Sequence, residues 1–199
     1  MNRENRKHTG FAIAAFTDGD GNAATLEQLG ADVAFCVPFG HCPTERDIKE
    51  LLDGFLKENL IVFPGNKETY KKLKKIQESL NLQSLYVADS DNLSKIFFML
   101  SSLILAGEFK DVIESLESLE KQQVFHTSIR VKDDFLETLN AAADEKTLEP
   151  YSTVVVFGGK DCKPEDIDAI RAYFENNSAI EFTYLDGRQH DSDFIIGAC

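Results

Sequence analysis

The sequence predicts an α/β protein with two lobes: a larger lobe of βαβ units around a parallel sheet, and a smaller α/β lobe. Short apolar runs of strand length alternate with longer amphipathic stretches, which is the pattern of βαβ units. The 199 residues, 43% of them hydrophobic, are enough to bury a sizeable core. The alternation restarts after two consecutive helical stretches, so we place a boundary near Lys121, between lobes of residues 1–121 and 122–199.

The first lobe is predicted from its apolar periodicity. Its strands are expected at four apolar runs, 11–16, 32–37, 60–63 and 84–88. The first helix should cover 23–29. The second should begin at Thr44, because Asp47 follows three residues later and completes a capping signal. The third is rich in lysine and follows Asn66, a residue that suits a helix N-cap.

Two helices of different character should end the first lobe. Over 93–105 apolar residues surround nearly the whole helix, so it should be buried on most sides. Over 109–119 they keep to one face, and acidic residues occupy the other. The second lobe should contain strands and helices in the order strand 124–131, helix 133–145, strand 152–157, helix from about Pro164, and strands 180–185 and 194–198.

Composition excludes several classes of function. The net charge of −13 and the isoelectric point of about 4.7 disfavour nucleic acid and anionic membranes as partners. No apolar run approaches the ~18–20 residues of a membrane-spanning helix, and no hydrophobic signal segment is present, so we expect a cytoplasmic protein without membrane insertion. The four cysteines fit no zinc template, and we expect free thiols, with Cys36 packed as a small hydrophobic residue.

Loops rich in glycine and polar residues follow the first three predicted strands. They read "TDGDGN" (17–22), "PFGHCPTE" (38–45) and "PGNK" (64–67). The carboxyl ends of parallel strands share one sheet edge, and α/β proteins bind ligands there. A calcium loop is disfavoured, because its sixth position would be Ala23 and its twelfth Leu29. The first loop is therefore either a ligand loop or a tight solvated turn.

Catalytic signals are weak. His41 and Cys42 are a nucleophile–base pair by residue type, but adjacent side chains rarely point the same way, so a solvent-exposed histidine is the alternative. A basic helix face is either solvated or docks an acidic partner; it consists of Lys67, Lys71, Lys74 and Lys75. A Walker P-loop, GxGxxG, GxSxG, HExxH and the kinase signatures are all missing from the sequence.

Three loops together resemble one bacterial family. The sequence "FGHCPT" (39–44) stands where that family carries a GGQTMNPS-type loop, "FPGN" (63–66) where it carries LPNN, and "GRQH" (187–190) where it carries GGQP. The family is the C-terminal domain of the fatty acid kinase A subunit, also called dihydroxyacetone kinase-like or YloV-like, and its fold is related to DegV and dihydroxyacetone kinase. This chain departs from it by losing the first Gln, one Asn of the pair and the final Pro.

The resemblance implies a non-catalytic domain, because the family's ATP-binding domain precedes the matched region. It implies binding of a DegV-like fatty-acid-binding protein, a kinase-domain protein or a small ligand in a cleft between the lobes, with no cofactor and no metal. The alternative is a stand-alone DegV-like protein that binds a small molecule or an acyl chain. The expected binding residues are Asp18, Gly19, Asp20, Gly21, Asn22, Gly40, His41, Gly65, Asn66, Arg188 and Gln189.

Two further expectations concern the loop at 186–193. We expect it to be an altered family loop between the last two strands, with Asp186-Gly187 starting the chain reversal. Gln189 and Asn66 should be exposed and should supply the main polar contacts, because amides both donate and accept hydrogen bonds. A third interpretation is an enzyme that uses His41 or His190 as an acid or base.

Overall fold

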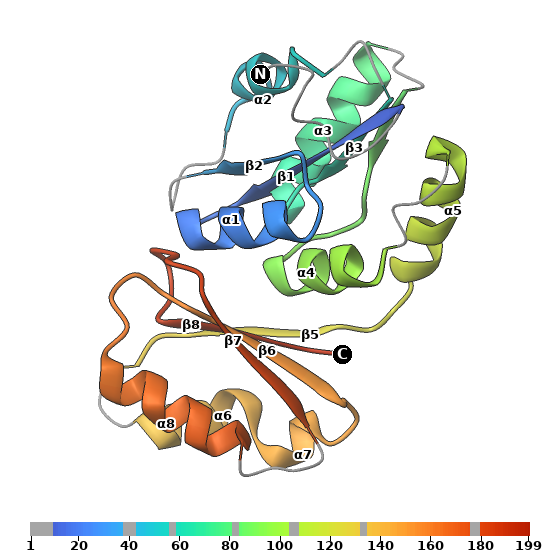
Figure 1. Cartoon of the computed structure of the whole chain (residues 1–199). Coiled ribbons are helices and arrows are strands. Elements are labelled where there is room, and N and C mark those ends of the chain that lie inside the picture. The colour runs from blue at the N-terminus through green and yellow to red at the C-terminus, as the bar shows by residue number, and fades with distance from the viewer. Residues whose placement is uncertain are drawn as a thin grey trace.

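The computed structural model describes residues 10–37, 43–55, 59–80, 84–103, 108–131, 135–175 and 180–199, and contains two four-stranded sheets (Figure 1). Sheet A has the strand order β2-β1-β3-β4 and is entirely parallel. Sheet B has the order β5-β8-β6-β7, in which β8 runs antiparallel to both of its neighbours. The two-lobed α/β fold expected from the sequence is confirmed.

In the described part of the chain, the first lobe holds sheet A and five helices. Its strands are β1 (Phe11–Thr17), β2 (Val33–Cys36), β3 (Asn59–Phe63) and β4 (Leu85–Val87). Its helices are α1 (Asp20–Gln28), α2 (Glu45–Leu52), α3 (Lys67–Ser79), α4 (Leu93–Ser102) and α5 (Phe109–Leu119). Each predicted element is present.

The described residues of the second lobe form sheet B and three helices. Its strands are β5 (Phe125–Ile129), β6 (Thr153–Gly158), β7 (Glu181–Asp186) and β8 (Phe194–Ala198). Its helices are α6 (Phe135–Ala143), α7 (Glu145–Leu148) and α8 (Pro164–Glu175). The last two strands do not form a hairpin with each other, because β6 lies between β7 and β8.

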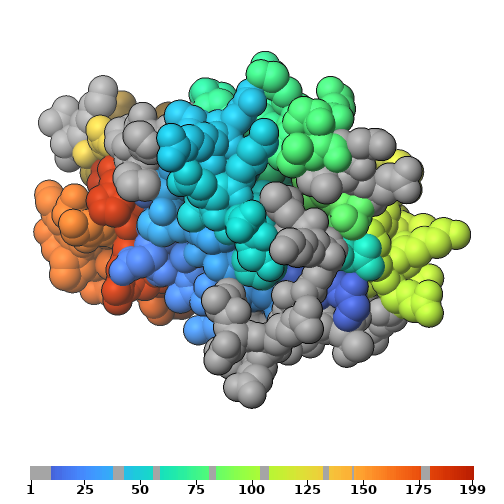
Figure 2. All heavy atoms as spheres, turned by 90° about the horizontal axis from the view of Figure 1, so that it is seen from above, coloured from blue at the N-terminus to red at the C-terminus, as the bar shows by residue number. Residues whose placement is uncertain are grey.

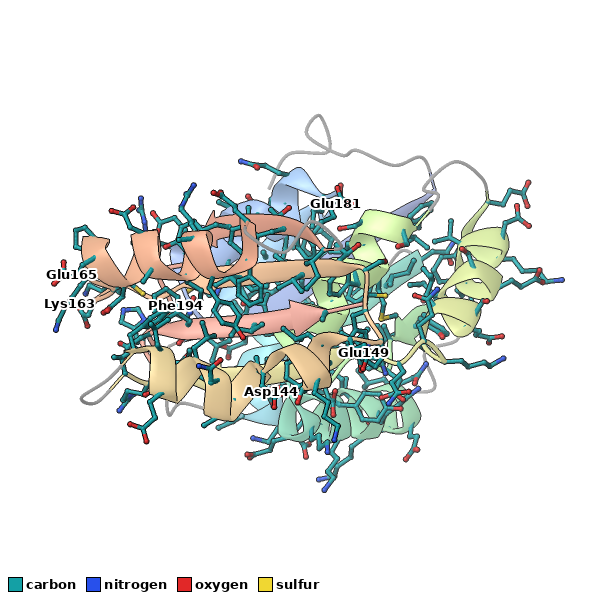
Figure 3. All side chains as sticks on the ribbon, turned by 90° about the horizontal axis from the view of Figure 1, so that it is seen from below. Asp144, Glu149, Lys163, Glu165, Glu181 and Phe194 are labelled. Carbon is teal, nitrogen blue, oxygen red and sulfur yellow. The ribbon has the colours of Figure 1, made fainter. Side chains whose placement is uncertain are left out.

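The elements form five layers (Figure 1). Helices α2 and α3 cover the outer face of sheet A (Figure 2), and α6 and α8 cover the outer face of sheet B. Figure 3 shows the second lobe from below, with Phe194 of β8 lying between α6 and α8. Helices α1 and α4 lie between the two sheets, so the central layer joins the lobes through a shared hydrophobic core.

The strand pattern explains how one sheet serves two cores. Along β1, Phe11, Ile13 and Ala15 face the central layer, while the alternating residues face α2 and α3. Successive side chains of a strand point to opposite faces, so a strand buried on both sides is apolar throughout. This is why "FAIAAF" appears in the sequence as a continuous apolar run.

Helix α4 has the burial that its sequence predicts. Phe98, Met99 and Leu100 are each at most 6% exposed, because sheet A lies on one side of the helix and sheet B on the other. Phe97 is only half-buried, yet its ring makes edge-on contacts with the rings of Phe98 and Phe157 at 5.4 and 5.5 Å between centroids. The helix therefore connects the lobes by direct apolar contact.

Two local expectations need correction. β2 was expected to be a buried strand, but it is an edge strand with half-buried residues, and Cys36 at its end is exposed rather than packed. α1 begins at Asp20, three residues before the predicted start. Among the described residues, no helix is long and apolar enough to span a membrane.

Candidate functional site

A pocket of about 260 Å³ lies between the lobes, at the carboxyl edge of sheet A. The first lobe supplies the ends of β1 and β2 and the loops that precede α3 and α4. The second lobe closes the pocket with β5, β8 and the β7–β8 connection. The described lining residues are Phe16, Thr17, Asp18, Asn22, Val37, Gly65, Asn66, Asp91, Asn92, Leu93, His126, Asp191 and Ile195.

Two helix N-termini border the pocket. The Asn66 side chain caps α3 by accepting from the N–H of Thr69 at 2.8 Å, and Asn92 caps α4 by accepting from the N–H of Lys95 at 2.8 Å. Each cap satisfies one first-turn donor, and an N-terminus has further N–H groups to offer a ligand. The chain runs from strand to helix in both places, so these loops must open at the same sheet edge.

His126 extends from β5 of the second lobe to this edge. Its Nδ1 lies 2.8 Å from Oγ of Ser94, a fully buried residue in the first turn of α4. This contact leaves Nε2 as the ring nitrogen available to the pocket. Burial lowers the pKa of His126, and the nearby carboxylates of Asp91 and Asp191 oppose this effect only in part. The imidazole is therefore neutral at pH 7 and can donate or accept one hydrogen bond there.

Acidification should destabilise the protein through His126. The ordinary pKa of 6.5 is lowered by burial in the folded state, so the unfolded chain takes up the proton more readily. The contribution of neutral His126 to the free energy of unfolding is therefore fully present above pH 6.5. It is lost as the pH falls through the lowered pKa of His126 in the folded protein. We expect the free energy of unfolding, measured by urea titration, to fall more in the wild type than in His126→Gln between about pH 7.5 and 5.5. Parallel declines would contradict this prediction.

The loops at 17–22 and 186–190 bind each other rather than opening separately to solvent. The N–H of Asn22 donates to the carbonyl oxygen of Gly187 at 2.9 Å, and the N–H of His190 donates to Oδ2 of Asp18 at 2.9 Å. Arg188 lies 3.7 Å from the Asp20 carboxylate. We call this set of bonds between residues 18–22 and 186–190 the interlobe contact. It uses the N-terminus of α1, so the loop at 17–22, which was expected to be either a ligand loop or a tight solvated turn, packs against the other lobe.

Glycine makes this close approach available. A Cβ at Gly19, whose φ is 86°, would lie 2.3 Å from the carbonyl oxygen of Gly187. A Cβ at Gly21 would lie 1.9 Å from the carbonyl oxygen of Asp186. No larger side chain fits at either position without moving backbone. The glycines of "TDGDGN" therefore serve lobe–lobe packing.

Gln189 was expected to be exposed, and this expectation is wrong. Its side chain is 1% exposed, accepts from Nδ2 of Asn22 at 3.2 Å and donates to the carbonyl oxygen of Phe157 at 2.9 Å. Both ends of the amide are thus used inside the protein. Gln189 holds the two lobes together, and it does not line the pocket that the described residues form.

The other expected binding residues divide into two groups. Asp18, Asn22, Gly65 and Asn66 line the pocket, and Asn66 is also exposed as expected. A second group belongs to the interlobe contact and consists of Gly19, Asp20, Gly21 and Arg188. Gly40 and His41 lie outside the described residues.

His190, which was considered as an acid or base, is bound to the first lobe. Its Nδ1 lies 3.2 Å from Oδ1 of Asp18, and it is not among the described lining residues. Two lysines of the basic face of α3 also form ion pairs within the protein, Lys67 with Asp91 at 3.5 Å and Lys75 with Glu45, and both side chains stay largely exposed.

Sequence reasoning missed Asp91, Asn92, His126 and Asp191. A signal for the first two was present, because "ADSDN" (88–92) is a fourth polar loop after a predicted strand of the same sheet. His126 and Asp191 come from the second lobe, and their position depends on how the lobes pack.

Comparison with known proteins yields only structural relatives. No family model and no curated protein matches the chain. A fatty-acid-binding DegV family protein of Thermus thermophilus superposes with a TM-score of 0.60 at 10% identity, over 96% of this chain and 99% of that one. A DegV family protein of Corynebacterium glutamicum gives 0.64 at 6% identity, over 95% and 96%.

A DegV lipid-binding protein of Thermotoga maritima gives a TM-score of 0.63 at 11% identity, over 96% of this chain and 98% of that one. The similarity extends over both lobes in all three cases, and the low identities limit it to architecture. The chain has the two-lobed α/β fold of DegV family proteins.

Proposed function

We propose that this protein is a non-catalytic binding protein that holds a small amphiphilic ligand, of the acyl-lipid type, in the pocket between its lobes. The observation that carries this proposal is the composition of the pocket wall. Phe16, Leu93 and Ile195 supply apolar surface, while the N-termini of α3 and α4 and the imidazole of His126 supply polar groups. A concave wall that combines apolar surface with convergent polar groups is typical of small-molecule sites.

The structural neighbours support the lipid class of ligand. The Thermus protein binds fatty acid and the Thermotoga protein binds lipid, and both share the two-lobed architecture of this chain. The sequence resemblance to the fatty acid kinase A subunit instead suggested docking of a DegV-like partner. The fold comparison favours ligand binding by this chain over such docking, because the neighbours are themselves DegV family proteins.

We propose a non-catalytic role because two candidate catalytic side chains, Ser94 and His190, already make contacts within the protein. The buried hydroxyl of Ser94 is engaged by His126, and the exposed His190 is engaged by Asp18. A nucleophile needs an accessible atom and a base oriented toward it. Ser94, at 0% exposed, has the base but not the access.

Filling the pocket should abolish binding. Val37 lines the pocket and is half-buried, so Val37→Trp places an indole in the ligand volume. We expect isothermal titration with octanol and octanoate to give at least one saturable isotherm for the wild type, and an affinity lower by about tenfold or more for Val37→Trp.

The matched control is Leu136→Trp, which adds an indole to the exposed outer side of α6, where Leu136 is 51% exposed. It should bind as the wild type does. Failure of the wild type to bind either compound, together with native mass spectra free of co-purified lipid, would contradict the proposed function. Equal affinity of Val37→Trp and the wild type for the ligand would show that the ligand binds outside this pocket.

A further inference from the structure

The charge of the pocket wall restricts the polar end of the ligand, an inference that rests on the proposed function. Three of the lining residues are aspartates, namely Asp18, Asp91 and Asp191. Within the described wall there is no lysine or arginine. The pocket therefore has three carboxylates around a volume of about 260 Å³.

The described contacts of Asp91 and Asp191 do not include a buried cationic partner for either carboxylate. Asp91 accepts from Nδ2 of Asn92 at 2.9 Å and lies 3.5 Å from Nζ of Lys67, but the Lys67 side chain is 82% exposed and solvent screens this pair. Asp191 accepts from Oγ of Ser192 at 3.1 Å, and Arg130 donates to the carbonyl oxygen of Asp191 rather than to its carboxylate. The hydrogen bonds to the two carboxylates come from a neutral amide and a neutral hydroxyl, so they orient the carboxylates and bring no positive charge.

Asp18 is held at the other side of the pocket. Its Oδ2 accepts from the N–H of His190, and its Oδ1 lies 3.2 Å from the ring Nδ1 of the same residue. The Asp18 side chain is 20% exposed, so part of it still faces solvent. The interlobe contact thus fixes one negative charge of the pocket wall.

The positive charge that faces the pocket is smaller than the negative charge of its three aspartates. A helix N-terminus is equivalent to about half of a positive charge, so α3 and α4, whose N-termini border the pocket, together supply roughly one charge against three carboxylates. His126 adds no full charge, because burial favours its neutral form. The local balance is negative, in a chain whose net charge is −13.

We propose that the pocket selects amphiphiles whose polar end is uncharged or cationic and donates hydrogen bonds, such as an alcohol, an amide or an amine, over free carboxylates. Such groups donate to the carboxylates of Asp91 and Asp191, whereas a carboxylate has no donor and is repelled by both. The apolar part lies against Phe16, Leu93 and Ile195 in either case.

Four probes of equal chain length test this selection: octanol, octanamide, octylamine and octanoate. Isothermal titration at about pH 7.5 should give octanoate an affinity about tenfold or more below that of the best of the other three. The difference should shrink at high salt, because added ions screen charges that solvent reaches. If octanoate binds as tightly as the best of the others, the head-group inference is wrong while ligand binding stands; if none of the four binds, the proposed function fails.

Two isosteric variants test whether the carboxylates of Asp91 and Asp191 cause the weaker binding of octanoate. Asp91→Asn and Asp191→Asn each keep the Oδ1 acceptor that Asn92 or Ser192 uses, and each removes one negative charge from the wall. Each should raise octanoate affinity several-fold relative to octanol. The control Glu114→Gln removes the same charge from the exposed face of α5, where the side chain is 66% exposed, and should leave the ratio unchanged. Ratios that move equally in all three variants would overturn the assignment to the pocket.

Discussion

Replacing Gly21 by alanine is expected to destabilise the protein by about 3 kcal/mol or more, at the upper end of the cost of overpacking. In an ordinary helix this change is favourable by roughly 0.5–1 kcal/mol, because alanine has the higher helix propensity. Here the new Cβ would lie 1.9 Å from the carbonyl oxygen of Asp186, a backbone atom that cannot rotate away. The interlobe contact must therefore separate, and Asn22 loses its bonds to Gly187 and Gln189.

Urea unfolding of the variant measures this loss. The matched control is Gly54→Ala, because a Cβ at Gly54 meets nothing within 4 Å and its stability should change by less than about 0.5 kcal/mol. A Gly21→Ala protein as stable as Gly54→Ala would mean that the lobes do not approach each other as closely as this structure has them.

Truncation of Phe157 to alanine is expected to cost about 3–5 kcal/mol, the usual range for a large aromatic core residue. The Phe157 side chain is 0% exposed and extends from β6 into the central layer. Its ring meets that of Phe97 on α4 edge-on at 5.5 Å, so the cavity opens at the junction between the second lobe and α4.

The free energy of unfolding from urea titration tests this value as well. Leu136→Ala, on the exposed side of α6, is the control and should cost less than about 0.5 kcal/mol. A loss below about 1 kcal/mol for Phe157→Ala would indicate that the lobes repack around the missing ring, and that the central layer is not a closely packed core.

Local patterns were sufficient to predict the fold because its strands and helices each have their own signal. The capping box of α2 is formed by Thr44 and Asp47, as their spacing predicts. The burial of β2 was misjudged, since an apolar strand of four residues has the same sequence signal at the edge of a sheet as at its centre. Which strand becomes an edge depends on strand order, and this is a property of the whole chain.

The candidate site was predictable only on its first-lobe side. Asn66 could be placed at the pocket because strand, loop and helix follow one another directly in a βαβ unit. Gln189 could not be placed in the same way. Its partner Asn22 is 167 residues away, and no local property of "DGRQH" distinguishes a loop that binds a ligand from a loop that binds the other lobe.

The strand order of sheet B has a consequence for the order of assembly during synthesis. Among the described strands β5 pairs only with β8, so residues 125–129 lack a described partner strand until residues 194–198 have been made. All pairs of sheet A, by contrast, join strands within residues 11–87. Because closing a long loop must precede such distant pairing, the second sheet should form late and as one unit. Until then the apolar surface of α4 that faces β8 stays open, which makes the nascent chain most prone to aggregation in this interval.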